Sequence, residues 1–205
     1  MGLRVAVEGS DGSGKSSVIA HLSALARERR LTTEVIGRKG DYATRSVNAM
    51  TSLLSIDLQT NAECRVRLAR AWQRADQAAR SPADIVLIDR FVVSDLARIQ
   101  PLAEADPSIG RELHEIFQFS LVAATLRCEC PFDLSWTRTL TRGTAHLSKK
   151  ELRGYDYNLA LSTRAESIFY DGRLTGHRYQ VDTAQDLDDT KRKLAVMLDV
   201  LLTLR

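Results

Sequence analysis

The chain has 205 residues, of which 44% are hydrophobic and 27% are charged, and its formal net charge is +3. These values fit one globular domain with a sizeable core. Only 11 glycines and 4 prolines are present, which excludes a collagen-like or low-complexity chain. The small net charge gives no support for nucleic-acid binding by bulk charge.

Apolar, strand-like runs alternate with helical patterns along the chain, which predicts an α/β fold with a parallel sheet wrapped by helices. Strands are expected at Leu3–Gly9, Thr32–Ile36, Ile85–Asp89, Thr125–Cys130 and Arg178–Asp182. Helices are expected at Lys15–Arg30, Ala43–Ile56, Ala62–Arg80, Arg111–Val122, Phe132–Leu140, Ser162–Tyr170 and Leu187–Leu204. The polar stretch Arg142–Gly154 has weak periodicity, so we expect a mobile loop there.

The segment Gly9–Ser16 reads GSDGSGKS and fits the pattern G-x-x-x-x-G-K-[ST] of a phosphate-binding loop. It lies where the mechanism requires it, between a buried strand and a helix whose N-terminus adds positive potential. Lys15 is expected to reach the β- and γ-phosphates, and the Ser16 hydroxyl to bind Mg²⁺. We assign ATP binding to Gly9, Ser10, Asp11, Gly12, Ser13, Gly14, Lys15, Ser16 and Ser17.

A carboxylate and a guanidinium follow the most strand-like run of the sequence, Ile85–Ile88. Asp89 would lie at the carboxyl end of a parallel strand, where it can hold the Mg²⁺ shell. Arg90 offers a planar fork that suits an oxyanion. We therefore expect Asp89 to be a metal residue and Arg90 to bind phosphate.

These two motifs together resemble the thymidylate kinase family. The opening EGSDGSGKSS from Glu8 is similar to that family's EGxDGxGKST, and DRFVVSDLARIQ from Asp89 is similar to its DRYxxSxxAYQ. The resemblance covers nearly the whole chain and is loose outside these motifs. It implies a single P-loop kinase domain over residues 1–205, with a five-stranded parallel sheet and a lid at about 142–154. It also implies transfer of the ATP γ-phosphoryl group, with Mg²⁺, to a nucleoside monophosphate.

The resemblance also implies roles for individual residues. Asp11, Arg38, Arg70, Arg90 and Gln100 would bind the acceptor. Arg138, on the helix that leads to the lid, and Ala184, after the last strand, would bind ATP. Some thymidylate kinases carry an arginine in the P-loop after the acidic residue, where this chain has Gly12 and Ser13. The lid would then have to meet the transition-state charge, and Arg142, Lys149, Lys150 and Arg153 are available there. The catalytic residues that we assign are Lys15, Asp89, Arg90, Arg142 and Arg153. Replacing Arg142 or Arg153 by alanine is expected to reduce kcat by on the order of 10²-fold.

The acceptor half departs from the family pattern, because Arg38 is followed by Lys39-Gly40 and Arg98-Ile99 stands where the family has Tyr-Gln. Substrate specificity depends on the acceptor contacts, so the sequence leaves three alternatives for the identity of the acceptor. It is dTMP, another nucleotide or nucleoside, or a non-nucleotide hydroxyl compound such as an antibiotic or a sugar-like metabolite. A P-loop ATPase switch is the alternative of another class.

Partners and location follow from weaker signals. The family resemblance implies a homodimer. No apolar run approaches the roughly 18 residues of a membrane span, and the N-terminus has no signal-peptide pattern. The three cysteines, Cys64, Cys128 and Cys130, form no disulfide framework. We therefore expect a cytoplasmic protein that binds a small-molecule acceptor, and neither nucleic acid nor a membrane.

Overall fold

A computed structural model describes residues 2–37, 73–105, 122–143, 147, 150–171 and 175–204. Its five strands are β1 (Leu3–Glu8), β2 (Thr33–Ile36), β3 (Ile85–Asp89), β4 (Ala124–Glu129) and β5 (His177–Asp182). Its labelled helices are α1 (Lys15–Glu28), α4 (Val92–Ala105), α6 (Phe132–Leu140), α7 (Tyr155–Asp171) and α8 (Leu187–Leu202), with a 3₁₀ helix, η2, at Glu151–Arg153. Residues 73–80 are also helical.

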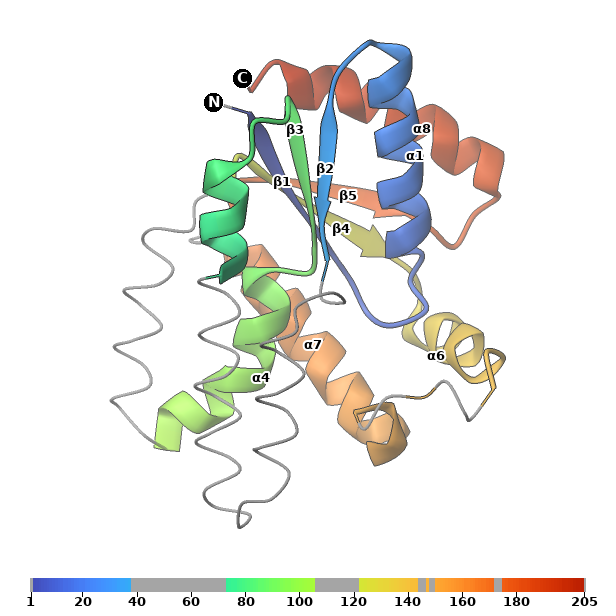
Figure 1. The fold of residues 1–205 in the computed structure, drawn as a ribbon. Coiled ribbons are helices and arrows are strands. Elements are labelled where there is room, and N and C mark those ends of the chain that lie inside the picture. The colour runs from blue at the N-terminus through green and yellow to red at the C-terminus, as the bar shows by residue number, and fades with distance from the viewer. Residues whose placement is uncertain are drawn as a thin grey trace.

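The five strands form one parallel sheet in the order β2-β3-β1-β4-β5, which confirms the predicted α/β fold class (Figure 1). The central strands β1 and β3 are buried on both faces, so they read as continuous apolar runs. Their register pairs Val7 with Asp89, so the P-loop and Asp89 emerge at the same edge of the sheet.

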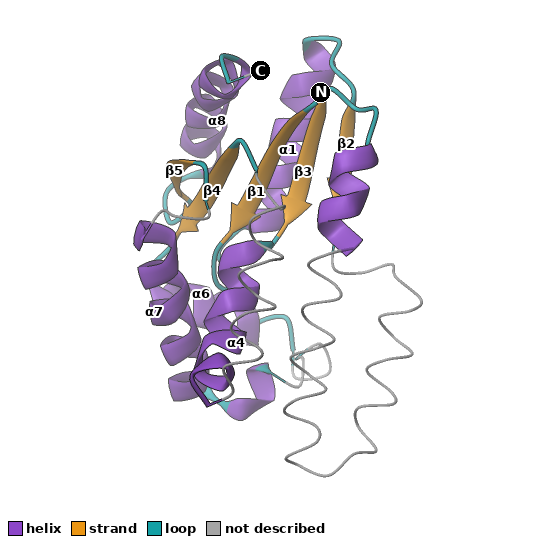
Figure 2. Ribbon diagram, turned by 90° about the vertical axis from the view of Figure 1, so that its left-hand side faces the viewer, coloured by secondary structure: helices purple, strands orange, loops and turns teal. Residues whose placement is uncertain are grey.

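Helices cover both faces of the sheet, and alternate strand residues pack against each layer (Figure 2). On one face, Val5 and Val7 of β1 share a core with Leu22 of α1 and Leu198 of α8. On the other face, Ala6 shares a core with residues of α4 and of the helix at 73–80. Beyond the carboxyl ends of the strands, α4, α6 and α7 gather at one end of the molecule (Figure 1).

The structure differs from the sequence prediction in two places that matter for the site. Helix α4 is absent from the predicted elements, because Pro101 interrupts its apolar pattern. Helix α7 begins at Tyr155 rather than Ser162, because its first turn is polar and gives no apolar stripe. Within the predicted loop Arg142–Gly154, residues Glu151–Arg153 form the 3₁₀ helix η2, which is followed directly by α7.

Several predicted elements fall outside the described residues. These are the helix at Ala43–Ile56, most of Ala62–Arg80, and Arg111–Val122 except its last residue. Within the part of the chain that the structure describes, no helix has the length and apolar character of a membrane span.

Candidate functional site

The P-loop joins β1 to α1, and two of its glycines adopt the left-handed backbone that the turn requires. The φ angles are 81° at Gly12 and 86° at Gly14, and only glycine adopts this conformation at little cost. Ser13 N–H donates to the Ser10 carbonyl (3.3 Å), and Val18 N–H donates to the Gly14 carbonyl to begin α1. The loop therefore has a phosphate-cradling shape.

Lys15 lies folded into this loop. Its ammonium donates to the Ser10 carbonyl at 2.5 Å, and the residue is only 7% exposed. Burial, with Arg90 nearby, holds the pKa of Lys15 well below its usual range. An anionic phosphate would replace the carbonyl as a far better partner, so the site favours binding of a polyphosphate.

Helix α6 packs against the P-loop at Gly12. A Cβ built at Gly12 would lie 2.0 Å from the Ser135 carbonyl oxygen and 2.7 Å from Thr139 Oγ1. Ser10 Oγ also donates to Ser135 Oγ at 3.1 Å. Position 12 therefore has no room for a side chain, so an arginine directly after Asp11 would not fit this loop.

Gly12→Ala is expected to destabilise the fold by roughly 3 kcal/mol, from left-handed strain plus overlap with Ser135. Gly143→Ala is the matched control, because Gly143 has a similar φ of 87° and no atom of the described residues lies within 4 Å of the point that a Cβ would occupy there. It should lose only the roughly 1–2 kcal/mol of backbone strain. Urea unfolding measures both variants. Equal losses would contradict the tight contact between α6 and the P-loop.

Asp89 stands at the end of β3, and its buried Oδ1 atom has no hydrogen-bond partner among the residues that the structure describes. A buried, unpartnered carboxylate oxygen is costly, and a bound cation would satisfy it. Ser16 is exposed at the start of α1, at the same edge of the sheet. Oxygen donors of this kind suit Mg²⁺, so Ser16 and Asp89 fit the predicted metal role.

Arg90 follows with a left-handed backbone (φ 61°), which is unusual for a residue with a side chain. Two buried groups hold this conformation. Glu8, 1% exposed, accepts from Phe91 N–H at 2.7 Å and from the Ser94 hydroxyl. Arg74 donates to the Arg90 carbonyl at 2.6 Å and pairs with Asp95. The local strain is thus compensated by a hydrogen-bonded frame around Arg90.

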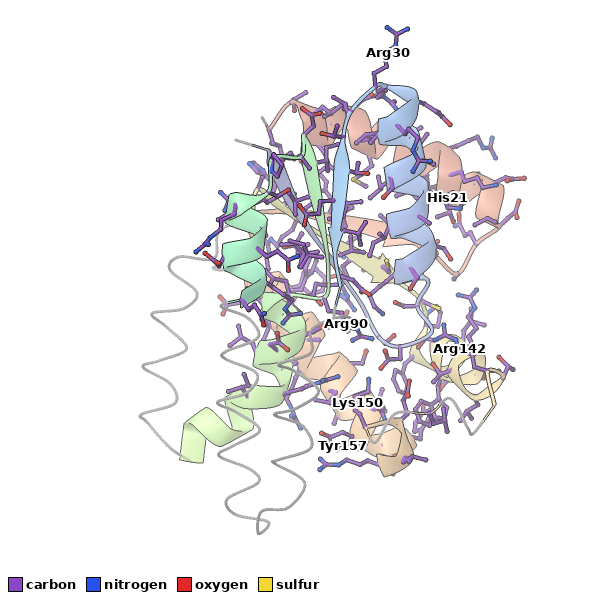
Figure 3. All side chains as sticks on the ribbon, viewed as in Figure 1. His21, Arg30, Arg90, Arg142, Lys150 and Tyr157 are labelled. Atoms are coloured by element: carbon purple, nitrogen blue, oxygen red, sulfur yellow. The ribbon has the colours of Figure 1, made fainter. Side chains whose placement is uncertain are left out.

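The Asp11 carboxylate forms ion pairs with two cationic side chains. Arg90 Nη2 pairs with its Oδ1 and Lys150 Nζ pairs with its Oδ2. The structure therefore brings together a P-loop residue, the Asp-Arg pair of β3 and a lid residue, as Figure 3 shows for Arg90 and Lys150. Burial lowers the pKa of both Arg90 and Lys150.

A cleft opens from this cluster. The P-loop forms one end of the cleft, α4 and α7 form walls, and Phe132 and Trp136 of α6 add an aromatic surface. Its described lining contains Gly9, Ser10, Asp11, Arg90, Ser94, Ala97, Arg98, Phe132, Trp136, Lys150, Asn158, Leu161, Ser162 and Ala165. Three of these residues are cations and one is a carboxylate, so the described walls favour an anionic ligand.

Among the lid cations that the structure describes, only Lys150 lines this cleft. Arg142 is exposed after α6. Arg153 is exposed, and its guanidinium lies 4.7 Å from the ring centroid of Tyr157. The catalytic roles expected of Arg142 and Arg153 stay predictions, and the geometry favours Lys150 as the lid cation nearest the P-loop.

The predicted ATP residues outside the P-loop also come together. Arg138 of α6 donates to the Thr183 carbonyl at 3.1 Å, next to Ala184. The Thr183 hydroxyl lies 2.7 Å from the Ser13 carbonyl, which ties this segment to the P-loop. Arg138 and Ala184 are thus linked to the P-loop through Thr183, while nucleotide binding by them stays a prediction.

Three predicted acceptor residues cannot be placed. Arg38 and Arg70 lie outside the described residues, and for Gln100 the structure describes only its backbone position in α4. Cys64 also lies outside them. Cys128 is buried, and burial raises the pKa of its thiol to about 12, so this residue stays a protonated packing group.

Sequence reasoning missed Arg74, Asn158 and the framing role of Glu8. Arg74 lies four residues after Arg70 in the sequence, and no pattern distinguishes it from a surface arginine. Asn158 belongs to the polar first turn of α7, whose sequence gives no helical signal. Glu8 stands within a recognised motif, but nothing in the sequence shows that its carboxylate reaches Phe91 and Ser94.

Comparisons with known proteins support the fold and the class of chemistry. No protein-family model matches the chain. In sequence, it is 25% identical over 218 residues to a thymidylate kinase of Pediococcus pentosaceus, with 97% of each chain covered. In structure, it is similar to a deoxyadenosine kinase from M. mycoides, solved with dCMP and dCDP, with a TM-score of 0.69, 15% identity, and coverage of 97% of this chain and 100% of that one. The chain thus has the fold of P-loop nucleoside and nucleotide kinases, and these relatives indicate a phosphotransferase of kinase type.

Proposed function

We propose that this protein transfers the γ-phosphoryl group of ATP to a nucleoside monophosphate, with dTMP as the first candidate. The observation that carries the proposal is the junction at Asp11. There the P-loop, which would hold the γ-phosphate, forms one end of a cleft lined by Arg90, Arg98 and Lys150. A donor phosphate and an acceptor anion would meet at this point.

Phosphoryl transfer requires mainly positioning and charge neutralisation. The P-loop amides and Lys15 would hold the β- and γ-phosphates. Arg90 would leave Asp11 and bind the acceptor phosphate. The Asp11 carboxylate could then accept a hydrogen bond from a hydroxyl of the acceptor sugar. When bound, Mg²⁺ would neutralise charge between the phosphates, with Ser16 and Asp89 as the protein groups that hold its shell.

Charge favours a monophosphate over a nucleoside as the acceptor. Arg90, Arg98 and Lys150 oppose one described carboxylate, Asp11, in the cleft lining. Arg90 and Lys150 share Asp11 as a partner, and a neutral nucleoside would bring no further charge to them. A phosphomonoester could accept charge-assisted hydrogen bonds from both, and each such bond contributes about 1.5–3 kcal/mol.

A nucleoside acceptor is the second candidate, and the structural likeness to a deoxyadenosine kinase favours it. Homodimer formation, a cytoplasmic location and a single domain with a lid stay predictions that accompany the proposal. The ATPase switch also stays open, since its nucleotide site would look the same.

Release of ADP with ATP and Mg²⁺ across a panel of acceptors tests the proposal. The panel contains the common ribo- and deoxynucleoside monophosphates, the corresponding nucleosides, and several sugar-like and aminoglycoside compounds. Turnover with one or more monophosphates, dTMP first among them, is the expected result. Turnover with nucleosides alone would establish the second candidate, and ATP hydrolysis without any acceptor dependence would favour the switch.

A further inference from the structure

Asn158, in the first turn of α7, joins that helix to the lid segment. The residue is 6% exposed, and its side-chain nitrogen donates to the Lys150 carbonyl at 3.1 Å and to the Gly154 carbonyl at 2.7 Å. These two carbonyls bracket the 3₁₀ turn Glu151–Arg153. One side-chain amide therefore hydrogen-bonds to the residues on both sides of the turn, Lys150 before it and Gly154 after it.

The chemistry of the partners determines how this amide must point. Both neighbours are carbonyl oxygens, so only the NH₂ side of the amide can face them. An aspartate or a leucine of similar size could not donate two hydrogen bonds. The position thus requires an asparagine in a way that packing alone would not explain.

A second contact holds the same segment from the other side. The Tyr155 hydroxyl donates to Asp133 of α6, and the Tyr155 ring packs edge-on against Phe132 and Trp136, with centroids 5.1 and 6.1 Å away. The segment from Lys150 to Tyr155 is thereby attached to both α7 and α6. These two helices also line the cleft into which Lys150 points.

We propose that Asn158 is a positioning residue that holds the Lys150 ammonium over the P-loop for phosphoryl transfer. The inference rests on the proposed function, in which Lys150 leaves Asp11 and contacts the transferred phosphoryl group. Asn158 also lines the cleft, but its side-chain nitrogen donates to the Lys150 and Gly154 carbonyls, so it acts through the Lys150 backbone. Because a small misplacement of a catalytic group can reduce rates by about 10²-fold, the effect of losing Asn158 should be kinetic.

A double-mutant cycle separates this role from a structural one. Asn158→Leu alone should reduce kcat by about 10- to 100-fold while KM for ATP changes by less than about two-fold. In a Lys150→Ala background, the same substitution should reduce kcat by less than about two-fold further. Thr163→Val is the matched control, since it removes a side-chain bond to the Leu159 carbonyl of the same helix without touching the lid.

Equal reductions by Asn158→Leu in both backgrounds would overturn the proposal, because Asn158 would then act independently of Lys150. Asn158→Ser, which removes the long amide with less change in packing, is measured in parallel in case the leucine variant does not fold. Unchanged kcat in a folded Asn158→Ser variant would also overturn it. Wild-type protein that shows no acceptor-dependent turnover would refute the proposed function itself, which is a different result.

Discussion

Lys15→Met should reduce kcat by roughly 10²–10³-fold, the scale of a lost transition-state donor in a buried site. Methionine keeps much of the side-chain volume and removes only the ammonium that would face the phosphates in the proposed function. The ligand-free protein should not lose stability, because burial of this ammonium is unfavourable and its pKa is lowered for that reason. The variant should therefore be folded and inactive, as seen by thermal unfolding and ADP release.

Lys191→Met is the control for this variant, because Lys191 lies on the surface of α8 with its side chain 43% exposed and pairs with Asp188. Its kcat should remain within about two-fold of wild type, since an exposed ion pair contributes little. A Lys15→Met variant that is folded and still turns over at the wild-type rate would show that the P-loop has no role in the reaction.

Lys150→Ala should reduce kcat by on the order of 10²-fold, and it should do so more strongly than Arg142→Ala or Arg153→Ala. Lys150 lines the cleft beside Asp11, whereas Arg142 is exposed and Arg153 stacks on Tyr157. Single-turnover measurement of the three variants under saturating ATP ranks them. If Arg142→Ala or Arg153→Ala has the larger effect, the catalytic cation is the arginine that the family resemblance suggested.

Lys150→Arg adds a test by pH. Burial lowers the pKa of Lys15 and Lys150, so kcat/KM, which reports free-enzyme groups, should fall as the pH rises through those pKa values. Arginine stays charged over this range. In the Lys150→Arg variant, kcat/KM should therefore fall at high pH only because Lys15 loses its proton. An unchanged pH profile would show that the Lys150 proton is not required.

Much of the fold followed from the sequence, because its strongest patterns come from buried strands. The runs at Val5–Val7 and Ile85–Ile88 are central strands covered on both faces, so their apolar character is continuous. Helix α4 was not predicted, because Pro101 interrupts its apolar pattern and its first turns lie within the motif that begins at Asp89. Helix α7 was predicted only from Ser162, because its first turns contact the lid rather than the core.

The donor half of the site could be predicted because a phosphate cradle needs a fixed backbone pattern, which the glycines and Lys15 reveal locally. The acceptor half depends on side chains from four distant segments. Glu8, Arg74 and Asn158 act through side-chain hydrogen bonds to particular partners, and such bonds leave no periodic pattern in the sequence. Lys150 differs from neighbouring lid cations only in where η2 directs it, and that direction arises from tertiary contacts with Asn158 and Asp11.

Transfer of label from γ-labelled ATP tests the central claim most directly. The protein is incubated with Mg²⁺, labelled ATP and a mixture of nucleoside monophosphates, and the products are separated by chromatography, with Lys15→Met in parallel. We expect label to move into a nucleoside diphosphate with wild-type protein and not with the variant. Label found only in inorganic phosphate, whatever acceptor is present, would contradict the account.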